Sequence, residues 1–110
     1  MKEFEKIDYL PLGSVVVLKK GMQKIIIIAR GIVIKSLNPP VFFDYGGSLY
    51  PQGLIGDQIF YFNHKDIDEV IYPGYTNEDD KKMVNIINGG FRDSGYERKD
   101  ITELSKRGTK

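Results

Sequence analysis

The chain contains one histidine, and its neighbours are residues that could carry out acid–base chemistry. His64 lies in the segment "NHKD", two residues before Asp66. A histidine that is oriented by a carboxylate can act as a general base. However, no obvious nucleophile is near, and Asn63 lies at N-cap spacing from Asp66, so a single helical turn explains the same residues. We therefore interpret His64 as a turn residue and predict that the protein is not an enzyme.

The other polar motifs do not form a metal or cofactor site. The chain has no cysteine and one histidine, and its acidic residues are too scattered to supply three or four converging ligands. The segment "GGSLYPQGLIG" is glycine-rich, but it lacks both phosphate-binding patterns, and no helix is predicted to follow it. We expect neither a metal nor a cofactor, and we interpret Gly46, Gly47 and Gly53 as structural glycines.

Aromatic residues are concentrated around this glycine-rich segment. Exposed aromatic rings can stack on nucleic-acid bases, but such sites usually also carry basic residues. Residues 41–63 contain no lysine or arginine and include the acids Asp44 and Asp57. The rings are therefore expected to pack in the core or to form a patch for a protein partner, not to bind nucleic acid. The candidate partner-binding residues are Phe43, Tyr45, Tyr50 and Tyr61.

Length, charge and composition indicate a small cytoplasmic domain. A chain of 110 residues is typical of one domain. The absence of cysteine favours a reducing compartment, and the acidic N-terminus does not resemble a signal peptide. The longest apolar run, "IIIIA", is too short to span a bilayer. The net charge of +1 gives no reason to expect nucleic acid or an anionic membrane.

Five segments rich in β-branched and aromatic residues predict strands that would position these side chains. They cover residues 14–20, 23–35, 41–50, 58–62 and 67–72. Gly31 could mark a bulge or a sharp bend in the second strand. In the third strand, the adjacent Gly46 and Gly47 would allow a steep bend or the close approach of another segment. "PQG", with Pro51 and Gly53, ends that strand.

One amphipathic helix follows the predicted strands. Residues 76–90 have helical periodicity, with Thr76 as the expected N-cap and Gly89 as the expected C-terminal stop. The predicted fold is α+β: a small, strongly bent antiparallel sheet, similar to an SH3-like half-barrel, with a C-terminal helix. The domain is expected to span residues 10–91. Residues 1–9 and the polar tail 92–110 are expected to be flexible, with a second helix over 95–107 as the alternative for the tail.

Three segments together resemble a bacterial family known as domain of unknown function 4176. They are "LPLGSVVVLKKGMQKIIIIARG", "FDYGGSLYPQG" and "FYFNHKDIDEVIYPGYTNEDD", and the resemblance runs from about Leu10 to Phe91. The loop "VIKSLNPPV" and the tail beyond Phe91 are individual to this chain. The residues that carry the resemblance most specifically are Asp44, Tyr45, Gly47, Tyr50, Pro51, Gly53, Phe62, Asn63, His64, Asp66, Ile67, Val70, Gly74 and Tyr75.

Members of that family often occur beside type VIIb secretion genes and toxins with LXG domains. The resemblance implies an accessory or targeting factor that binds the helical N-terminal domain of an LXG toxin, alone or with other small helical accessory proteins. An immunity protein against such a toxin is the alternative function. The spacing of Tyr75 and Asp79 resembles the export signal of type VII substrates, although that signal normally follows a helical hairpin. Co-export with the toxin therefore stays open.

Overall fold

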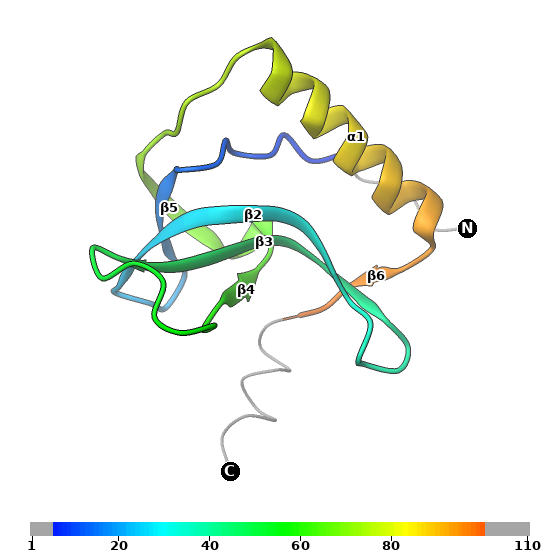
Figure 1. The fold of residues 1–110 in the computed structure, drawn as a ribbon, viewed down its shortest axis with the longest axis horizontal. Coiled ribbons are helices and arrows are strands. Elements are labelled where there is room, and N and C mark those ends of the chain that lie inside the picture. The colour runs from blue at the N-terminus through cyan, green and yellow to red at the C-terminus, as the bar shows by residue number, and fades with distance from the viewer. Residues whose placement is uncertain (1–5, 101–110) are drawn as a thin grey trace.

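Residues 6–100 form a bent, unclosed sheet with one helix, as the sequence predicted. The structure, a computed structural model, describes residues 6–100. Five strands follow the order β4-β3-β2-β1-β5 across the sheet, and a short sixth strand pairs with β3 (Figure 1). The elements are β1 (Val15–Leu18), β2 (Lys24–Ile34), β3 (Val41–Tyr50), β4 (Phe60–Phe62), the 3₁₀ turn η1 (His64–Asp66), β5 (Ile67–Tyr72), α1 (Glu78–Ser94) and β6 (Glu97–Arg98).

The long hairpin of β2 and β3 is the centre of the sheet. The two strands pair antiparallel from Lys24 opposite Tyr50 to Ile34 opposite Val41. Their register shifts between Ile27 and Ala29, which is typical of a β-bulge and places the irregularity just before Gly31. On its other side, β3 pairs antiparallel with β4 and parallel with β6. The strand β3 is therefore hydrogen-bonded to neighbours on both sides.

Gly47 lets β2 and β3 approach closely. A Cβ atom at this position would lie 2.6 Å from the carbonyl oxygen of Ile26 and 2.6 Å from Cγ2 of Ile25. At Gly46 the nearest atoms, on Ile32 and Ile59, would be 3.2 Å away and belong to side chains that can shift. The expected close contact of another segment is thus present at Gly47, where backbone atoms leave no room for a side chain.

We expect Gly47→Ala to lower the free energy of unfolding by about 1–3 kcal/mol, because the new Cβ would push the two central strands apart. Gly46→Ala should cost less. Gly90→Ala is the matched control, since a Cβ there would meet no heavy atom within 4 Å and alanine favours a helix. Urea unfolding of the three variants would measure the differences. Equal stabilities for Gly47→Ala and Gly90→Ala would contradict the close-approach explanation.

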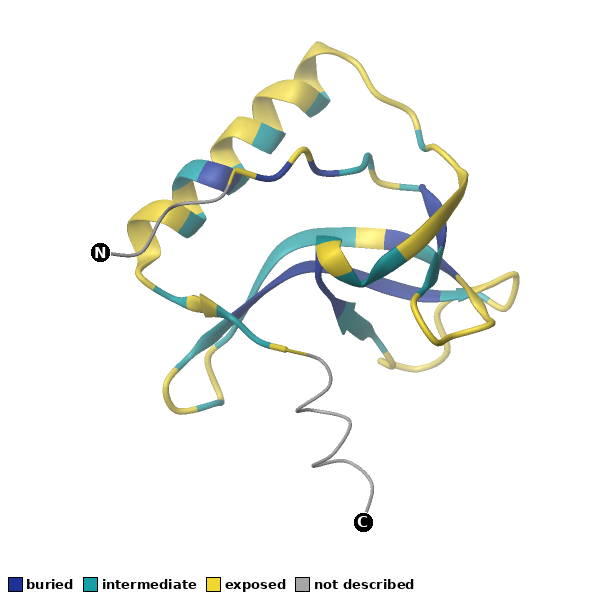
Figure 2. Cartoon of the chain, turned by 180° about the vertical axis from the view of Figure 1, so that it is seen from behind, coloured by how far each residue is buried: buried dark blue, intermediate teal, exposed yellow. Residues whose placement is uncertain are grey.

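The core lies between the sheet, the helix and the N-terminal segment. Its buried cluster contains Ile7, Tyr9, Val16, Ile25, Ile27, Tyr45 and Phe62. The segment before β1 runs between the sheet and α1, and part of it is buried (Figure 2). The prediction of a flexible segment over residues 1–9 is therefore wrong for residues 6–9, because Ile7 and Tyr9 are core residues. Residues 1–5 lie outside the described residues.

The helix α1 begins and ends later than predicted. Asn77, not Thr76, is the N-cap, and its side chain accepts the N–H of Asp80. Gly95, not Gly89, ends the helix in the left-handed conformation, with φ of 74°. Glycine is tolerated within a helix at a cost of about 1 kcal/mol, so Gly89 alone does not stop it. Within residues 6–100, no helix combines the length and apolar character needed to cross a membrane.

The apolar residues of α1 do not all face the core. Val84 and Ile87 pack against it, and Ile87 lies over Gly31 of β2. Met83 and Ile86, which have the same apolar character, are exposed. Successive residues of a helix point in different directions, so one narrow stripe covers the sheet and the second faces solvent.

The chain does not leave the domain at residue 92, so the predicted flexible tail is wrong for residues 92–100. The helix continues to Ser94, and Glu97 and Arg98 form β6 against the first residues of β3. The N–H of Lys99 also donates to the carbonyl of Phe42 at 3.0 Å. The alternative prediction, a helix over residues 95–107, is therefore wrong for Glu97 and Arg98, which form a strand. Residues 101–110 are outside the described part of the chain.

Candidate functional site

A buried carboxylate in the middle of β3 organises the polar groups of the protein. Asp44 is only 1 % exposed. Its Oδ1 accepts hydrogen bonds from the Tyr9 hydroxyl at 2.8 Å and from Nε of Arg98 at 2.8 Å. Its Oδ2 accepts the backbone N–H of His64 at 2.9 Å. A buried charge is costly unless it is paired and hydrogen-bonded, and Asp44 is both.

Asn63 connects this carboxylate to the turn before β5. Its Oδ1 accepts the backbone N–H of Asp44 at 3.0 Å, and its Nδ2 donates to the carbonyl of Lys99 at 2.7 Å. The Asp66 carboxylate accepts the Asn63 N–H at 2.8 Å, which completes the capping box predicted for this turn. Asn63 and Asp66 therefore hold the turn and the C-terminal segment in place.

His64 contacts Tyr45, not Asp66. The Tyr45 hydroxyl accepts the backbone N–H of Leu10 at 2.9 Å and lies 2.7 Å from Nδ1 of His64. This geometry allows the phenol to donate its own proton to the imidazole. Because the Asp66 oxygen caps the turn, it does not orient the ring as a catalytic carboxylate would. The arrangement gives His64 a structural partner.

Two tyrosines of this network hold their protons strongly. Burial raises the pKa of Tyr9, and the adjacent Asp44 carboxylate raises it further. Burial also raises the pKa of Tyr45, although the hydrogen bond from Leu10 acts in the opposite direction. Burial by itself would lower the pKa of Arg98, but its hydrogen bond and ion pair with Asp44 outweigh this and raise it. Near neutral pH the two phenols are thus uncharged, which suits structural donors better than nucleophiles or bases.

These pKa shifts predict a loss of stability at alkaline pH. Below the ordinary tyrosine pKa of 10.0, folded and unfolded chains both keep the protons of Tyr9 and Tyr45. Above it the unfolded chain ionises first, so the free energy of unfolding should fall by about 1.4 kcal/mol per pH unit for each tyrosine. Urea unfolding across this range would measure the slope. The Tyr9→Phe/Tyr45→Phe double variant should have a shallower slope, and an unchanged slope would contradict the explanation.

The predicted aromatic binding face is wrong for two of its four residues. Phe43 and Tyr45 are fully buried, and they stack on Tyr61 and Phe62, with ring centroids 5.4 Å apart in each pair. The expectation assumed that β3 has a solvent face, but every residue from Phe42 to Ser48 is buried. Tyr50 is exposed at the end of the strand, and Tyr61 is half-buried.

The remaining residues predicted as structural occupy turns and close contacts. Pro51 follows Tyr50 through a cis peptide bond, and Gly53 has a φ of +82° and donates its N–H to the carbonyl of Leu49. Gly74 donates its N–H to Oγ of Ser14 at 2.9 Å, and a Cβ atom at Gly74 would collide with the carbonyl oxygen of Leu12. Gly74 therefore brings the segment after β5 against the segment before β1.

This contact assembles an apolar surface at one edge of the sheet. The strand β5 is the last in the sheet and pairs only with β1. Tyr72 at its end is 65 % exposed, and Tyr75 just beyond it is 79 % exposed. We call the exposed apolar residues of this region the β5 surface: Leu12, Val70, Ile71, Tyr72 and Tyr75. The β5 surface was not predicted from the sequence. A strand was expected over residues 67–72, but without a strand order the sequence could not show that this strand lies at the edge of the sheet.

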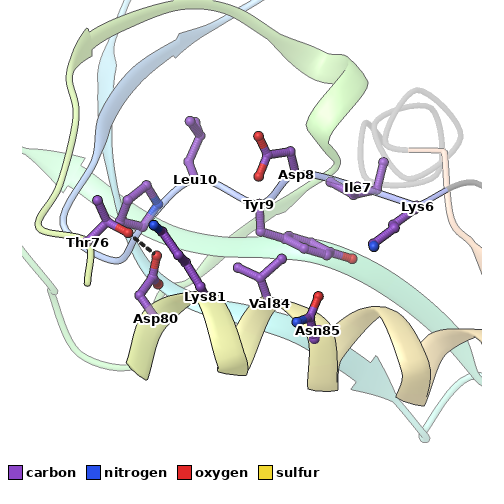
Figure 3. Close-up of a pocket in the computed structure, with 11 residues that line it drawn as sticks. Lys6, Ile7, Asp8, Tyr9, Leu10, Thr76, Asp80, Lys81, Val84 and Asn85 are labelled. Atoms are coloured by element: carbon purple, nitrogen blue, oxygen red, sulfur yellow. Dashed lines mark hydrogen bonds between the residues drawn. The ribbon is translucent and has the colours of Figure 1, made fainter. Parts of the chain in front are cut away.

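A pocket of about 660 Å³ lies beside the β5 surface, between the N-terminal segment and α1 (Figure 3). Its wall includes Pro11 and Thr76, which are the sequence neighbours of Leu12 and Tyr75. Asp80 on the helix accepts the Thr76 hydroxyl at 2.7 Å and pairs with the buried Arg30 at 2.8 Å. The other lining residues are Lys6, Ile7, Asp8, Tyr9, Leu10, Lys81, Val84 and Asn85. Among residues 6–100, no cluster of three or more histidine or acidic side chains could hold a metal ion.

Comparison with known proteins gives one match. No curated protein and no solved structure matches the chain. The family model described as "Domain of unknown function (DUF4176)" matches residues 9–83. The matched region includes Tyr9, Asp44 and the whole of β1 to β5, but it ends before Arg98. Because the match covers more than half of the 110 residues, the chain belongs to the domain of unknown function 4176 family.

Proposed function

We propose that this protein is a non-enzymatic accessory factor that binds the helical N-terminal domain of an LXG toxin in the cytoplasm and targets the toxin to type VIIb secretion. The observation that carries the proposal is the β5 surface. Its five apolar side chains lie along one edge of a small domain and are exposed in the isolated chain. Contiguous exposed apolar side chains of this kind are typical of protein-binding surfaces.

The residue types of the β5 surface suit an anchor for a protein partner. Tyr72 and Tyr75 each offer a large ring with few torsions to immobilise, and tyrosine is enriched among the residues that dominate interfaces. Val70 and Ile71 extend the apolar area along the strand. An amphipathic helix laid along this edge could cover all of these side chains with its apolar face.

The adjoining pocket would accept one side chain from such a helix. Val84, Leu10 and Ile7 give it an apolar lining, while Lys6 and Lys81 bring positive charge and Asp8 and Asp80 negative charge. Hot-spot residues of interfaces usually insert into pockets of this kind. The combination of an apolar edge strand and an adjoining pocket thus fits a partner with one protruding side chain on an apolar face.

The polar network supports a role without catalysis. Hydrogen bonds of three polar residues hold the turn and the chain ends in place: those of Asp44, Asn63 and Asp66. His64 is engaged by Tyr45. These groups are the ones whose types suggested chemistry, and each has a structural partner.

A pull-down with the two halves of a neighbouring LXG toxin tests the proposal. The full-length protein should retain the N-terminal half and not the C-terminal toxin half. Tyr72→Ala should reduce retention, while Ile86→Ala, an equally exposed apolar change on α1, should not. Retention of only the C-terminal half would instead support an immunity protein and reject the targeting role.

Co-export is a further part of the proposal that the same system can test. Tyr75 lies before α1 and Asp79 in its first turn, so the export-like spacing opens a helix. If the two residues act as a signal, Asp79→Ala should abolish appearance of the protein outside the cell while toxin binding persists. Secretion of the toxin without its accessory factor would show that the protein stays in the cytoplasm.

A further inference from the structure

The segment before β1 is buried among elements to which it is not directly joined. Residues 6–10 belong to no strand or helix, yet Ile7 is only 8 % exposed and Tyr9 only 3 %. Figure 2 shows this segment running between α1 and the sheet. Among the described residues, hydrogen bonds join residues 6–10 to β2, β3 and α1, although the next element along the chain is β1.

Both the backbone and the side chains of this segment are recognised. The Asn88 side chain on α1 accepts the N–H of Ile7 at 2.9 Å and donates to the carbonyl of Ile7 at 2.8 Å. On the sheet side, the Tyr9 hydroxyl donates to Asp44 of β3 at 2.8 Å. We call the residues of α1 and β3 that hold the segment the segment site: Asp44, Tyr45 and Asn88.

A tight turn is the connection between this segment and β1. Gly13 in the turn has a φ of +87°, and a Cβ atom there would meet no heavy atom within 4 Å. The need for glycine at this position therefore comes from the backbone conformation alone. The N–H and the hydroxyl of Ser14 close the turn by donating to the carbonyl of Pro11 at 3.2 and 2.8 Å. A change of backbone angles in residues 11–13 would redirect the segment and leave the segment site intact.

We propose that residues 11–13 are a hinge and that two copies of the protein exchange residues 6–10 to form a dimer. In this exchanged form, the segment of each copy occupies the segment site of the other. The incoming segment has the same sequence as the one held in the isolated chain, so it can make every hydrogen bond described above. Exchange of an identical element is a low-cost route to a dimer, because each copy recovers the contacts that it gives up.

The hinge determines the balance between the closed and the exchanged forms. The segment makes the same contacts in both, so the difference lies in the hinge conformation and in the entropy lost when two copies associate. An extended hinge does not need a positive φ at Gly13. A residue with a Cβ atom at position 13 should therefore strain the closed chain and leave the exchanged dimer relaxed.

The exchange also divides the pocket beside the β5 surface between two copies. One wall of the pocket is formed by residues 6–11, and the facing wall on α1 includes Lys81, Val84 and Asn85 (Figure 3). In the dimer, the first wall belongs to one copy and the second wall to the other. This assembly does not depend on the proposed binding of a toxin, so either proposal can fail without the other.

Sedimentation velocity over a concentration series of the full-length protein tests the exchange. Strain in the left-handed conformation should cost a residue with a Cβ about five-fold in the closed form. With two hinges in a dimer, Gly13→Ala should lower the dimer dissociation constant by about 25-fold. The matched control is Gly53→Ala, since Gly53 has a φ of +82° and equally open surroundings but lies in the loop after β3. Its dissociation constant should equal that of the original protein.

Cross-linking distinguishes an exchanged dimer from two closed chains that touch. The chain has no cysteine, so Asp8→Cys and Asn85→Cys each introduce a single thiol, on facing walls of the pocket. One chain carrying both substitutions should give an internal cross-link with a short bis-maleimide, which confirms that the reagent spans the pocket. Two chains carrying one substitution each, both with Gly13→Ala, should give a covalent heterodimer after mixing. Asp8→Cys mixed with Lys35→Cys, which lies off the pocket, should not.

Three results would overturn the proposal. The first is a monomer at every concentration for the original protein and both glycine variants. The second is an equal dissociation constant for Gly13→Ala and Gly53→Ala, because strain at the hinge would then have no special effect. The third is a Gly13→Ala dimer that forms no covalent link across the pocket, which would show two closed chains in contact.

Discussion

Asp44→Ala is expected to lower the free energy of unfolding by about 3–5 kcal/mol, the typical effect of breaking a buried ion pair. The substitution removes the acceptor for three donors at once: the Tyr9 hydroxyl, Nε of Arg98 and the N–H of His64. Arg98 would keep its charge in a largely enclosed position, stacked over Phe91 at 4.1 Å from the ring centroid. Urea unfolding followed by circular dichroism would measure the change.

The control for this prediction is an ion pair of the same chemistry at the surface. Asp93 pairs with Nε of Arg92 at 3.0 Å, but both side chains are exposed. Asp93→Ala should change stability by no more than about 1 kcal/mol. Tyr9→Phe, which removes one of the three donors, should have an effect between those two. If Asp44→Ala and Asp93→Ala were equally mild, the buried network would not be what holds the chain ends to the sheet.

The second large effect is expected in partner binding. Tyr72→Ala and Tyr75→Ala should each weaken binding of the toxin's N-terminal domain by about 2 kcal/mol, or roughly 30-fold, because each removes a large exposed ring from the β5 surface. Neither residue belongs to the core, so the variants should unfold at the same temperature as the original protein. Isothermal titration calorimetry and a thermal melt would measure the two quantities.

Two comparison variants show whether the surface has been assigned correctly. Tyr50→Ala removes an exposed tyrosine from the other end of the sheet, and Met83→Asp changes the exposed stripe of α1. Both should leave toxin binding within a small factor. A loss of binding in folded Met83→Asp, with normal binding by the two tyrosine variants, would move the interface to the helix.

Local patterns predicted most of the secondary structure because they depend on neighbouring residues. The runs of isoleucine and valine predicted β1 and β2, and the capping box at Asn63 and Asp66 was found as expected. The glycine pair predicted a close approach, and Gly47 confirms it. The strands and the capping box are decided by backbone preference or by contacts a few residues apart, whereas the close approach at Gly47 joins two strands and only its glycine is visible in the local pattern.

Burial of β3 and attachment of the chain ends depend on contacts that local patterns do not record. Tyr45 was expected among the partner-binding residues, but its ring is buried, and its hydroxyl accepts the N–H of Leu10 and is hydrogen-bonded to Nδ1 of His64. Tyr9 and Arg98 are separated from Asp44 by 35 and 54 residues. Both were assigned to polar stretches, in which too few apolar residues are present to predict packing against the sheet. Their hydrogen bonds to the Asp44 carboxylate hold them there.

The meeting of Tyr9 and Arg98 at one carboxylate has a mechanical consequence. A force that pulls on either end of residues 6–100 reaches Asp44 in the central strand once the outermost contacts are lost, those of Ile7 with Asn88 at one end or those of Lys99 with Phe42 and Asn63 at the other. Once one end is detached, the other loses part of its own anchorage, since both ends share the same oxygen. Traction from a single terminus would therefore loosen both at once, and the domain should give way as a unit instead of peeling strand by strand.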